Sequence, residues 1–361
     1  MNNSVTPSDD EQTQHPPGSS TPLDYKAGAI DKFVRMFAGV MVATALLFLL
    51  NVYLTFGLNW PSMMGYFEAR EWFGFEAPRK ALSDEAMTQG MWQMLSYLGA
   101  AAIVCLFVLL TPARALRADA ALLTGFSKYL IRASFWAVFL VGLADMAISF
   151  LRVENMLHYF VDGEVIKALG RPIYRGVNVH YPLIAVAFVI ALFSRSLGFT
   201  WLALLVVFAE FQIVLLRFIF SYEQAFMGDL VRFWYAALFL FASAHTLVCE
   251  GHVRVDVLYA GFSVRAKAWA NTCGLILLGL PLCWIILTMG MWGKGNSINS
   301  PIFSFEVSQS GYGLYVKYMM VGYLVVFALS MIVQFSSYLL SNVADLRGEE
   351  NSEPAAAPTP H

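Results

Sequence analysis

Eight long apolar runs lie along the chain and are separated by shorter polar segments. A bilayer hydrocarbon core about 30 Å thick is crossed by roughly 20 apolar residues in a helix. Runs of this kind lie at 33–57, 91–111, 129–151, 180–195, 198–220, 230–249, 268–291 and 317–340. The pattern predicts an all-α integral membrane protein with about eight transmembrane helices. The fourth run is short, and only residues 194–198 separate it from the fifth, so we expect a tight helical hairpin there.

Polar segments flank this block of apolar runs. Residues 1–30 contain a cluster of Pro, Gly and Ser, and residues 342–361 are rich in Ala, Pro and Glu. Neither segment can bury enough apolar surface to offset the entropy lost on ordering, so both are predicted to be disordered tails. The first segment also lacks the basic start and short apolar core of a secretory signal.

Basic residues gather at alternate junctions between the runs. They precede the first run, follow the eighth, and occupy the second–third, fourth–fifth and sixth–seventh connections: Lys26, Lys32, Arg35, Arg114, Arg117, Lys128, Arg132, Arg195, Arg254, Arg265, Lys267 and Arg347. Cytoplasmic loops of membrane proteins carry such an excess of Lys and Arg. We therefore expect both termini in the cytoplasm and the connections at 58–90, 152–179 and 292–316 on the outer side.

Composition agrees with a membrane environment and excludes several other classes. The chain has 361 residues, of which 58% are hydrophobic and 13% are charged, whereas about a quarter of the residues of a soluble domain are charged. A net charge of −2 gives no basic excess for binding nucleic acid. The four cysteines are far apart and form no CxxC pair, so buried thiols are expected rather than disulfides or a zinc site.

The stretch CEGHVRVDVLY, residues 249–259, concentrates charge in a chain that otherwise has little. Gly251 is suited to end the sixth helix, because glycine adopts a left-handed conformation without strain. His252, Arg254 and Asp256 follow it. Apolar residues then recur at near-helical spacing up to position 262, which predicts a short helix lying in the membrane interface. Taken alone, this stretch is more simply explained as a basic stop-transfer flank of a membrane span.

Residues 217–334 carry several motifs in a fixed order. An Arg-aromatic-x-Phe signature ends the fifth run, and an acidic residue opens the sixth: Arg217, Phe218, Phe220 and Asp229. A G-H-x-x-x-D motif follows, and then an S-x-R motif that opens the next helix: Gly251, His252, Asp256, Ser263 and Arg265. An E-x-S pattern, a glycine pair and a lysine introduce the last run, and a glutamine lies near its end: Glu306, Ser308, Gly311, Gly313, Leu314, Lys317 and Gln334.

Together these motifs resemble the small permease subunit of tripartite ATP-independent periplasmic (TRAP) transporters. The resemblance covers about residues 198–341, some two-fifths of the chain. Two positions depart from the family pattern. Asp229 stands where Glu is more common, and Tyr315 stands where Pro commonly follows the Gly-Leu pair, so the direction in which the last helix starts is open.

The resemblance implies a function and partners. Such transporters pair a periplasmic substrate-binding protein with a small and a large subunit in the bacterial inner membrane, and a Na⁺ gradient drives uptake of organic anions, mostly carboxylates. The large subunit carries the substrate and Na⁺ sites, so no substrate, metal or cofactor site and no enzymatic activity is expected here. The small subunit scaffolds the large one and helps to dock the binding protein. The long N-terminal extension is similar to variants labelled for mannitol or chloroaromatic compounds, a label that does not fix the substrate.

The resemblance also divides the chain. We expect a disordered tail at 1–30, a four-span extension at 31–196, a four-span small-permease core at 197–341 and a second tail at 342–361. The extension is too short to be a fused large subunit, so its expected role is to add lipid-facing or partner-facing surface.

Ionisable residues inside spans carry a free-energy cost of about 3 kcal/mol near the bilayer centre and usually face protein or water. Glu210 either contacts the large subunit or pairs within this chain, seven residues before Arg217. Asp145 and Arg152 repeat this spacing, and pairing within the chain is the simpler expectation. We also predict an Arg217–Asp229 contact, because an Arg–carboxylate fork is favoured where water is scarce. A docking point for the binding protein is the alternative at Asp229.

Two other classes of function are considered. His180 and His245 could ligate a haem in a membrane redox subunit, but membrane haem proteins usually offer histidine pairs spaced about 13 residues apart on a helix. A stand-alone solute carrier would need Gly- or Pro-broken helices meeting midway across the bilayer. Gly274, Gly279 and Pro281 form one such cluster of breaks. The sequence shows no nucleophile–base arrangement, phosphate loop or metal-ligand spacing.

Overall fold

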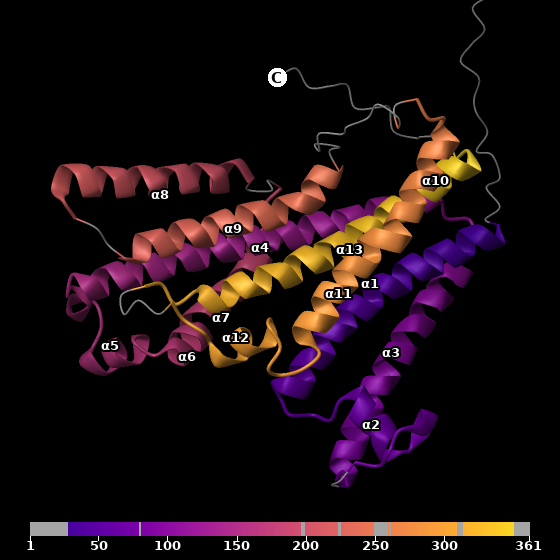
Figure 1. The fold of residues 1–361 in the computed structure, drawn as a ribbon, viewed down its shortest axis with the longest axis horizontal. Coiled ribbons are helices and arrows are strands. Elements are labelled where there is room, and N and C mark those ends of the chain that lie inside the picture. The colour runs from indigo at the N-terminus through magenta and orange to yellow at the C-terminus, as the bar shows by residue number, and fades with distance from the viewer. Residues whose placement is uncertain are drawn as a thin grey trace, which may run out of the picture.

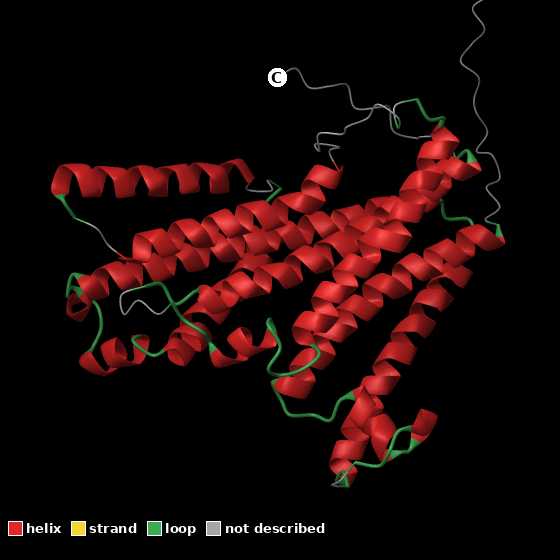
Figure 2. Cartoon of the chain, viewed as in Figure 1, coloured by secondary structure: helices red, strands yellow, loops and turns green. Residues whose placement is uncertain are grey.

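The computed structural model describes residues 28–78, 81–195, 199–222, 225–248, 259, 261–308 and 313–349. Within these ranges all regular structure is helical, as Figure 2 shows. Eight helical stretches are long and apolar enough to cross a membrane. The prediction of an all-α membrane protein with eight spans is therefore confirmed.

Four spans precede residue 196. They are α1 (Ala29–Phe56), α3 (Asp84–Leu110), α4 (Leu116–Val153) and the continuous stretch α6 (Pro172–Arg175), η3 (Gly176–His180) and α7 (Tyr181–Phe193). The other four are α8 (Phe199–Phe220), α9 (Ala225–Val248), the stretch α10 (Val264–Gly274), η4 (Leu275–Gly279) and α11 (Leu280–Met291), and α13 (Lys317–Arg347). Short helices lie in the connections: α2 (Met63–Ala69), η1 (Trp72–Gly74), η2 (Leu157–Tyr159), α5 (Gly163–Leu169) and α12 (Asn299–Ser304).

The fourth span begins at Pro172, earlier than the apolar run predicts. A π-helical turn, η3, precedes Pro182 in this span, and a second one, η4, precedes Pro281 in the seventh. A proline has no N–H for the helix ladder, and its ring clashes with the carbonyl four residues earlier. The wider π turn accommodates that clash. In the fourth span it brings His180 onto a fully buried position.

Helices α4 and α13 form the centre of the bundle and lie side by side (Figure 1). Helix α13 also packs against α1, α9, α10 and α11, and α4 also packs against α7 and α9. The main hydrophobic core combines side chains from before and after residue 196, such as Phe135 and Val141 with Phe233 and Ile332. The predicted extension and core segments therefore share one packed interior, and α4 is a central helix rather than an added outer surface.

Two spans lie at the periphery of the bundle in Figure 1. Helix α3 packs on α1 and the short α2, and α8 packs chiefly on α9. Both spans present large exposed apolar side chains, among them Leu98 and Ile103 on α3 and Val207 and Phe211 on α8. Exposed apolar surface of this kind suits lipid or a membrane partner. The expectation of an outward-facing surface therefore fits α3 within the predicted extension.

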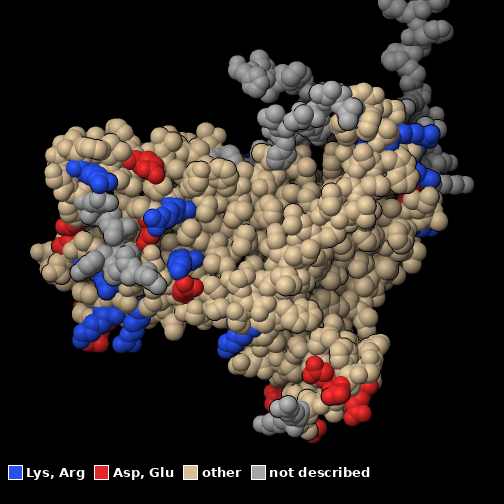
Figure 3. Space-filling model, viewed as in Figure 1, with Lys and Arg blue, Asp and Glu red and all other residues tan. Residues whose placement is uncertain are grey.

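Charged side chains lie toward the ends of the spans on the face drawn in Figure 3, and a broad uncharged band lies between them. At the end where α1 begins, ion pairs join three helices. Arg35 on α1 contacts Asp119 on α4 at 2.6 Å, and Arg117 on α4 contacts Asp345 on α13 at 2.6 Å. The short fourth–fifth connection lies partly outside the described residues, as does the predicted interfacial helix after span six.

Serine side chains cap three helices. The hydroxyl oxygens of Ser62, Ser83 and Ser263 accept hydrogen bonds from backbone N–H groups three residues later, at the starts of α2, α3 and α10. Such caps satisfy a donor that has no partner inside the helix. The sequence placed Ser263 at the opening of this helix, and the structure confirms that position.

Candidate functional site

Two consecutive backbone N–H groups before α13 are each held by an aspartate from another span. The N–H of Leu314 donates to Asp229 Oδ2 on α9 at 3.2 Å, and the N–H of Tyr315 donates to Asp145 Oδ2 on α4 at 2.7 Å. We call residues 313–316 the clasp segment. The two carboxylates that bind the clasp segment come from helices on either side of residue 196. The clasp segment therefore connects both halves of the chain to the start of α13.

Asp145 is the centre of a fully buried polar network. Arg175 Nη1 lies 2.8 Å from Asp145 Oδ1, His180 Nε2 lies 3.1 Å from the same oxygen, and all three side chains have no exposed surface. Arg175 also donates to the backbone carbonyl of Leu169 at 3.0 Å and to the hydroxyl of Ser149 at 3.2 Å. A buried carboxylate needs such compensation, because it has lost its hydration.

Two tyrosines from the start of α13 and the clasp segment complete this network. The hydroxyl of Tyr318 lies 2.9 Å from His180 Nδ1, and Arg152 Nη1 donates to the hydroxyl of Tyr315 at 2.7 Å. The guanidinium of Arg175 lies over the Tyr315 ring, 4.0 Å from its centroid. The Asp145 network thus joins α4, the fourth span and α13, and both ring nitrogens of His180 are engaged.

Tyr315 is one of the two positions at which the chain departs from the sequence pattern that it resembles. A proline there would have no N–H, and this N–H is the donor to Asp145 in the structure. Tyrosine in place of proline therefore keeps the N–H that binds Asp145. Asp145 itself lies in the segment that the resemblance does not cover.

Asp229 is the centre of a second cluster near the start of α9. The hydroxyl of Ser308 donates to Asp229 Oδ1 at 3.4 Å, and Arg232 Nη1 lies 3.6 Å from the same oxygen. Together with the Leu314 N–H, these contacts give the carboxylate three polar neighbours. Ser308 lies 79 residues from Asp229 in the sequence, so the fold unites two separate motifs.

The remaining motif residues lie beside this cluster. Lys317 Nζ contacts Glu306 Oε1 at 2.6 Å, and both side chains are nearly half exposed. A hollow of about 430 Å³ is bordered by Asp229, Arg232, Ser308 and Lys317 together with apolar residues of α13. We call Asp229, Glu306, Ser308, Gly313, Leu314 and Lys317 the motif cluster. Its members can bind and position a polar partner group.

Other predicted residues fall in different places. Arg217 lies in the last turn of α8; the structure gives Asp229 the guanidinium of Arg232, and the Arg217–Asp229 contact stays a prediction. Glu210 is exposed on α8, and no described residue pairs with it.

Asp145 pairs with Arg175 and His180, while Arg152, the partner suggested by spacing, binds Tyr315. Five predicted positions lie outside the described residues: Gly251, His252, Arg254, Asp256 and Gly311.

Sequence reasoning missed Arg175. It assigned residues 152–179 to an outer connection because the apolar run starts at 180, and it therefore gave this arginine no intramembrane role. A usable signal was present, since Arg175 and Asp145 are opposite charges close to apolar runs, and buried charges in membrane proteins usually pair. The same reasoning would have found His180 as a further neighbour.

The contacts of the Asp145 network and the motif cluster hold helices together and offer polar groups for binding. Among the described residues no group of three or more His, Cys, Asp or Glu side chains could hold a metal ion. The Asp145 network is fully buried, whereas the motif cluster has an exposed rim.

Comparison of the chain with protein-family models, with curated proteins and with solved structures finds no match.

Proposed function

We propose that this chain is the small membrane subunit of a Na⁺-coupled, binding-protein-dependent TRAP transporter for organic acids in a bacterial inner membrane. Its role is to hold the large permease subunit and to help dock the periplasmic binding protein. The observation that carries this proposal is the motif cluster. Residues recognised as separate family motifs, in α9 and in the segment before α13, contact one another in the fold.

The exposed rim of the motif cluster suits a protein partner. The side chains of Arg232, Lys317 and Glu306 are 75%, 46% and 43% exposed, respectively. Arg232 and Lys317 line a hollow at the end of the bundle where α9 and α13 begin, and Glu306 contacts Lys317 beside it. Sequence-based topology predicts this end to be periplasmic, which is where a soluble binding protein approaches. Charged groups at an exposed rim favour recognition and orientation of such a partner.

Helix α8 supports a second contact, inside the membrane. Glu210 is exposed there among large apolar side chains, including Val207 and Phe211. Lipid tails offer a carboxylate neither a hydrogen-bond donor nor a cation, so an ionisable residue in this position usually faces protein. A neighbouring membrane subunit packed on α8 would supply that partner. This face fits the large permease subunit.

The two rival classes fit the geometry less well. A haem ligand needs a free imidazole nitrogen, and both nitrogens of His180 are already engaged, by Asp145 and Tyr318. A stand-alone carrier needs broken helices that form one solute site near the middle of the bilayer. In the π turn η4, Leu277 and Leu278 are 71% and 73% exposed. Such apolar side chains give a polar solute no binding group, and they suit lipid or a neighbouring helix.

Co-purification tests the proposal. The tagged chain is expressed with a large permease and a periplasmic binding protein from the same genome, extracted in mild detergent and isolated. We expect the permease to co-purify, Asp229→Ala to reduce its recovery, and Asp229→Glu, the residue more common in the family, to restore it. Glu164→Gln is the matched control, because Glu164 pairs with Lys167 on the exposed surface.

Uptake assays provide the second readout. Cells with all three proteins should take up an organic acid in a Na⁺-dependent manner, and His252→Ala and Asp256→Ala should impair assembly and uptake. If the chain alone in liposomes carries a solute, or if the purified protein shows the visible absorption of haem, the scaffold assignment fails.

A further inference from the structure

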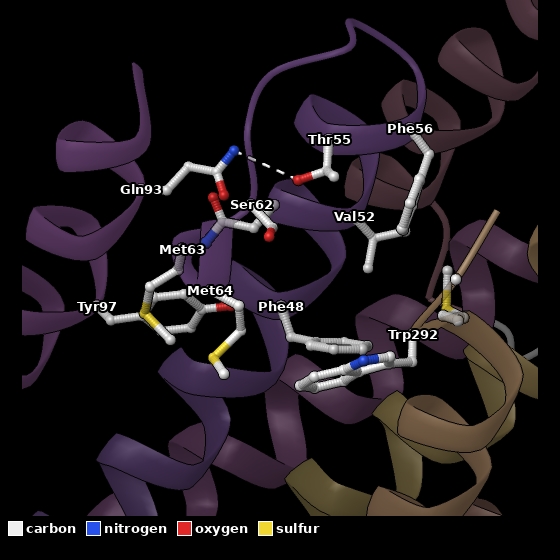
Figure 4. Close-up of a pocket in the computed structure, with 13 residues that line it drawn as sticks. Phe48, Val52, Thr55, Phe56, Ser62, Met63, Met64, Gln93, Tyr97 and Trp292 are labelled. Carbon is white, nitrogen blue, oxygen red and sulfur yellow. Dashed lines mark hydrogen bonds between the residues drawn. The ribbon is translucent and has the colours of Figure 1, made fainter. Parts of the chain in front are cut away.

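A second cavity lies among α1, α2, α3 and the end of α11, and the Asp145 network and the motif cluster contribute no residue to its lining. Its volume is about 330 Å³, which is in the range of small-ligand sites. Figure 4 shows its apolar wall, to which Phe48, Val52, Met64 and Trp292 contribute. Three of the four helices belong to the N-terminal spans, for which the proposed function supplies no specific task.

The polar side of this cavity is formed by amide and hydroxyl groups. Gln93 on α3 donates to the Thr55 hydroxyl on α1 at 3.4 Å, the contact drawn as a dashed line in Figure 4. Asn51, one turn before Thr55, lines the cavity and is 7% exposed. Neither its amide nitrogen nor its amide oxygen makes a hydrogen bond of normal geometry with a described residue, although the Tyr97 phenol is close enough to interact with it.

A buried amide with no satisfied hydrogen bond is unfavourable unless a ligand or water completes it. Asn51 offers two N–H donors and a carbonyl acceptor. The residues that line the cavity include no Asp, Glu, Lys, Arg or His. An ionised ligand would therefore have no counter-charge. The cavity suits a neutral molecule that has an apolar body and a carbonyl group.

The depth of Asn51 in the bilayer indicates which kind of molecule supplies this carbonyl group. Helix α1 has 28 residues and is therefore about 42 Å long, close to the thickness of a bilayer including its headgroup regions. Asn51 precedes the end of α1 at Phe56 by five residues, or about 8 Å. The border of the hydrocarbon core lies about 6 Å from either end of such a helix. Ester carbonyls of glycerolipids occupy this level.

We propose that this cavity binds the glycerol-ester region of a membrane lipid, with the Asn51 amide donating to an ester carbonyl and the acyl chain lying along the apolar wall. The lipid then acts as a structural ligand between α1 and α3. This inference goes beyond the proposed transport function and does not depend on it.

Direct binding to the purified full chain tests the inference. The protein is delipidated by extended washing in detergent, and binding of dioctanoylglycerol, a neutral glycerol diester, is measured by calorimetry and by the ligand-induced rise in melting temperature. Decylubiquinone supplies a neutral carbonyl from a quinone, and decanoate supplies a charged head. We expect the diester to bind, and the quinone and decanoate to bind at least tenfold more weakly.

Three leucine substitutions locate the site. Asn51→Leu and Gln93→Leu act from two different helices, and we expect each to weaken diester binding at least tenfold. Gln89→Leu is the matched control, because Gln89 lies one turn before Gln93 and bonds Glu85 on the exposed surface. Asn51→Leu should also melt no lower than the wild type without ligand, because it removes two unsatisfied polar atoms without changing the side-chain size much.

The outcomes separate the possibilities. Equal diester affinity in the wild type, Asn51→Leu and Gln93→Leu would overturn the site. Preference for decylubiquinone, lost in the same two variants, would overturn the glycerol-ester assignment in favour of a quinone. Equal weakening by Gln89→Leu would show that any substitution on α3 disturbs binding, and would also overturn the proposal.

Discussion

The backbone N–H of Tyr315 donates to a carboxylate oxygen of Asp145 at 2.7 Å, although 170 residues separate them in the sequence. This bond joins the clasp segment to the second half of α4, eight residues before that helix ends at Val153. The adjacent N–H of Leu314 binds Asp229 on α9. The position and direction of the first turn of α13 are therefore determined by two carboxylates from different spans. A change at either carboxylate is expected to act on α13 as a whole.

Substitution Tyr315→Pro should destabilise the protein. Proline removes the N–H that binds Asp145 and also restricts the backbone of Leu314 toward extended conformations. An unpaired buried acceptor costs about 1–3 kcal/mol. We expect a lower melting temperature in detergent and weaker protection of the start of α13 from hydrogen exchange.

The control for this variant is Tyr315→Phe. It keeps the N–H and the ring beneath Arg175 and loses only the hydroxyl, which accepts a hydrogen bond from Arg152 and donates one to the carbonyl of Gly170. We expect its melting temperature to fall less than that of the proline variant. Equal loss in both would mean that the hydroxyl, rather than the backbone bond to Asp145, stabilises the clasp segment.

The Asp145–Arg175 pair should show strong coupling in a double-mutant cycle. Asp145→Asn leaves the guanidinium of Arg175 buried without its counter-charge, and removing one member of a buried pair costs about 3–5 kcal/mol. Arg175→Met should be similarly harmful. The double variant should be more stable than the sum of the two losses predicts, because no isolated charge remains.

Lys167 and Glu164 provide the surface control for this cycle. Their side chains are 71% and 88% exposed, and exposed ion pairs contribute little to stability. Lys167→Met should therefore leave the melting temperature unchanged. Strict additivity of the Asp145 and Arg175 variants would contradict the buried pair.

Gly176→Ala should destabilise the fourth span. A Cβ at this position would overlap the ring of Phe305, whose backbone is in the left-handed region with φ 51°. Phe305 also packs against Tyr318, so its displacement would disturb a partner of His180. Overpacking of this kind costs about 1–3 kcal/mol, which a thermal melt detects.

The matched control is Gly125→Ala on α4, where no atom lies within contact of an added Cβ. Alanine has a higher helix propensity than glycine. This control should therefore keep or raise the melting temperature. A stable Gly176→Ala variant would show that Phe305 moves aside without loss.

Glu210→Gln should separate the two interpretations of this residue. Because Glu210 is exposed and no described residue pairs with it, we expect the isolated chain to keep its melting temperature. Removing the charge should weaken the proposed complex with a large permease subunit, as measured by the recovery of that subunit after salt washes. The neighbouring exposed Val207→Ala controls for a general loss of α8 surface. A marked fall in stability of the isolated chain would instead indicate pairing within this chain.

The sequence by itself determined the eight spans and the all-helical class. These are local properties. A span follows from the length of an apolar run and the bilayer thickness. No knowledge of helix neighbours is needed for either.

Only the tertiary structure decided how polar groups pair. Spacing along α4 suggested Arg152 for Asp145, whereas the fold supplies Arg175, His180 and the Tyr315 N–H. The tertiary structure also places α4 at the centre of the bundle and Glu210 on the exposed surface of α8. The physical reason is that hydropathy specifies which segments enter the membrane but not which helices become neighbours. Helix packing inside a bilayer depends on side-chain fit and on contacts between residues far apart in the chain.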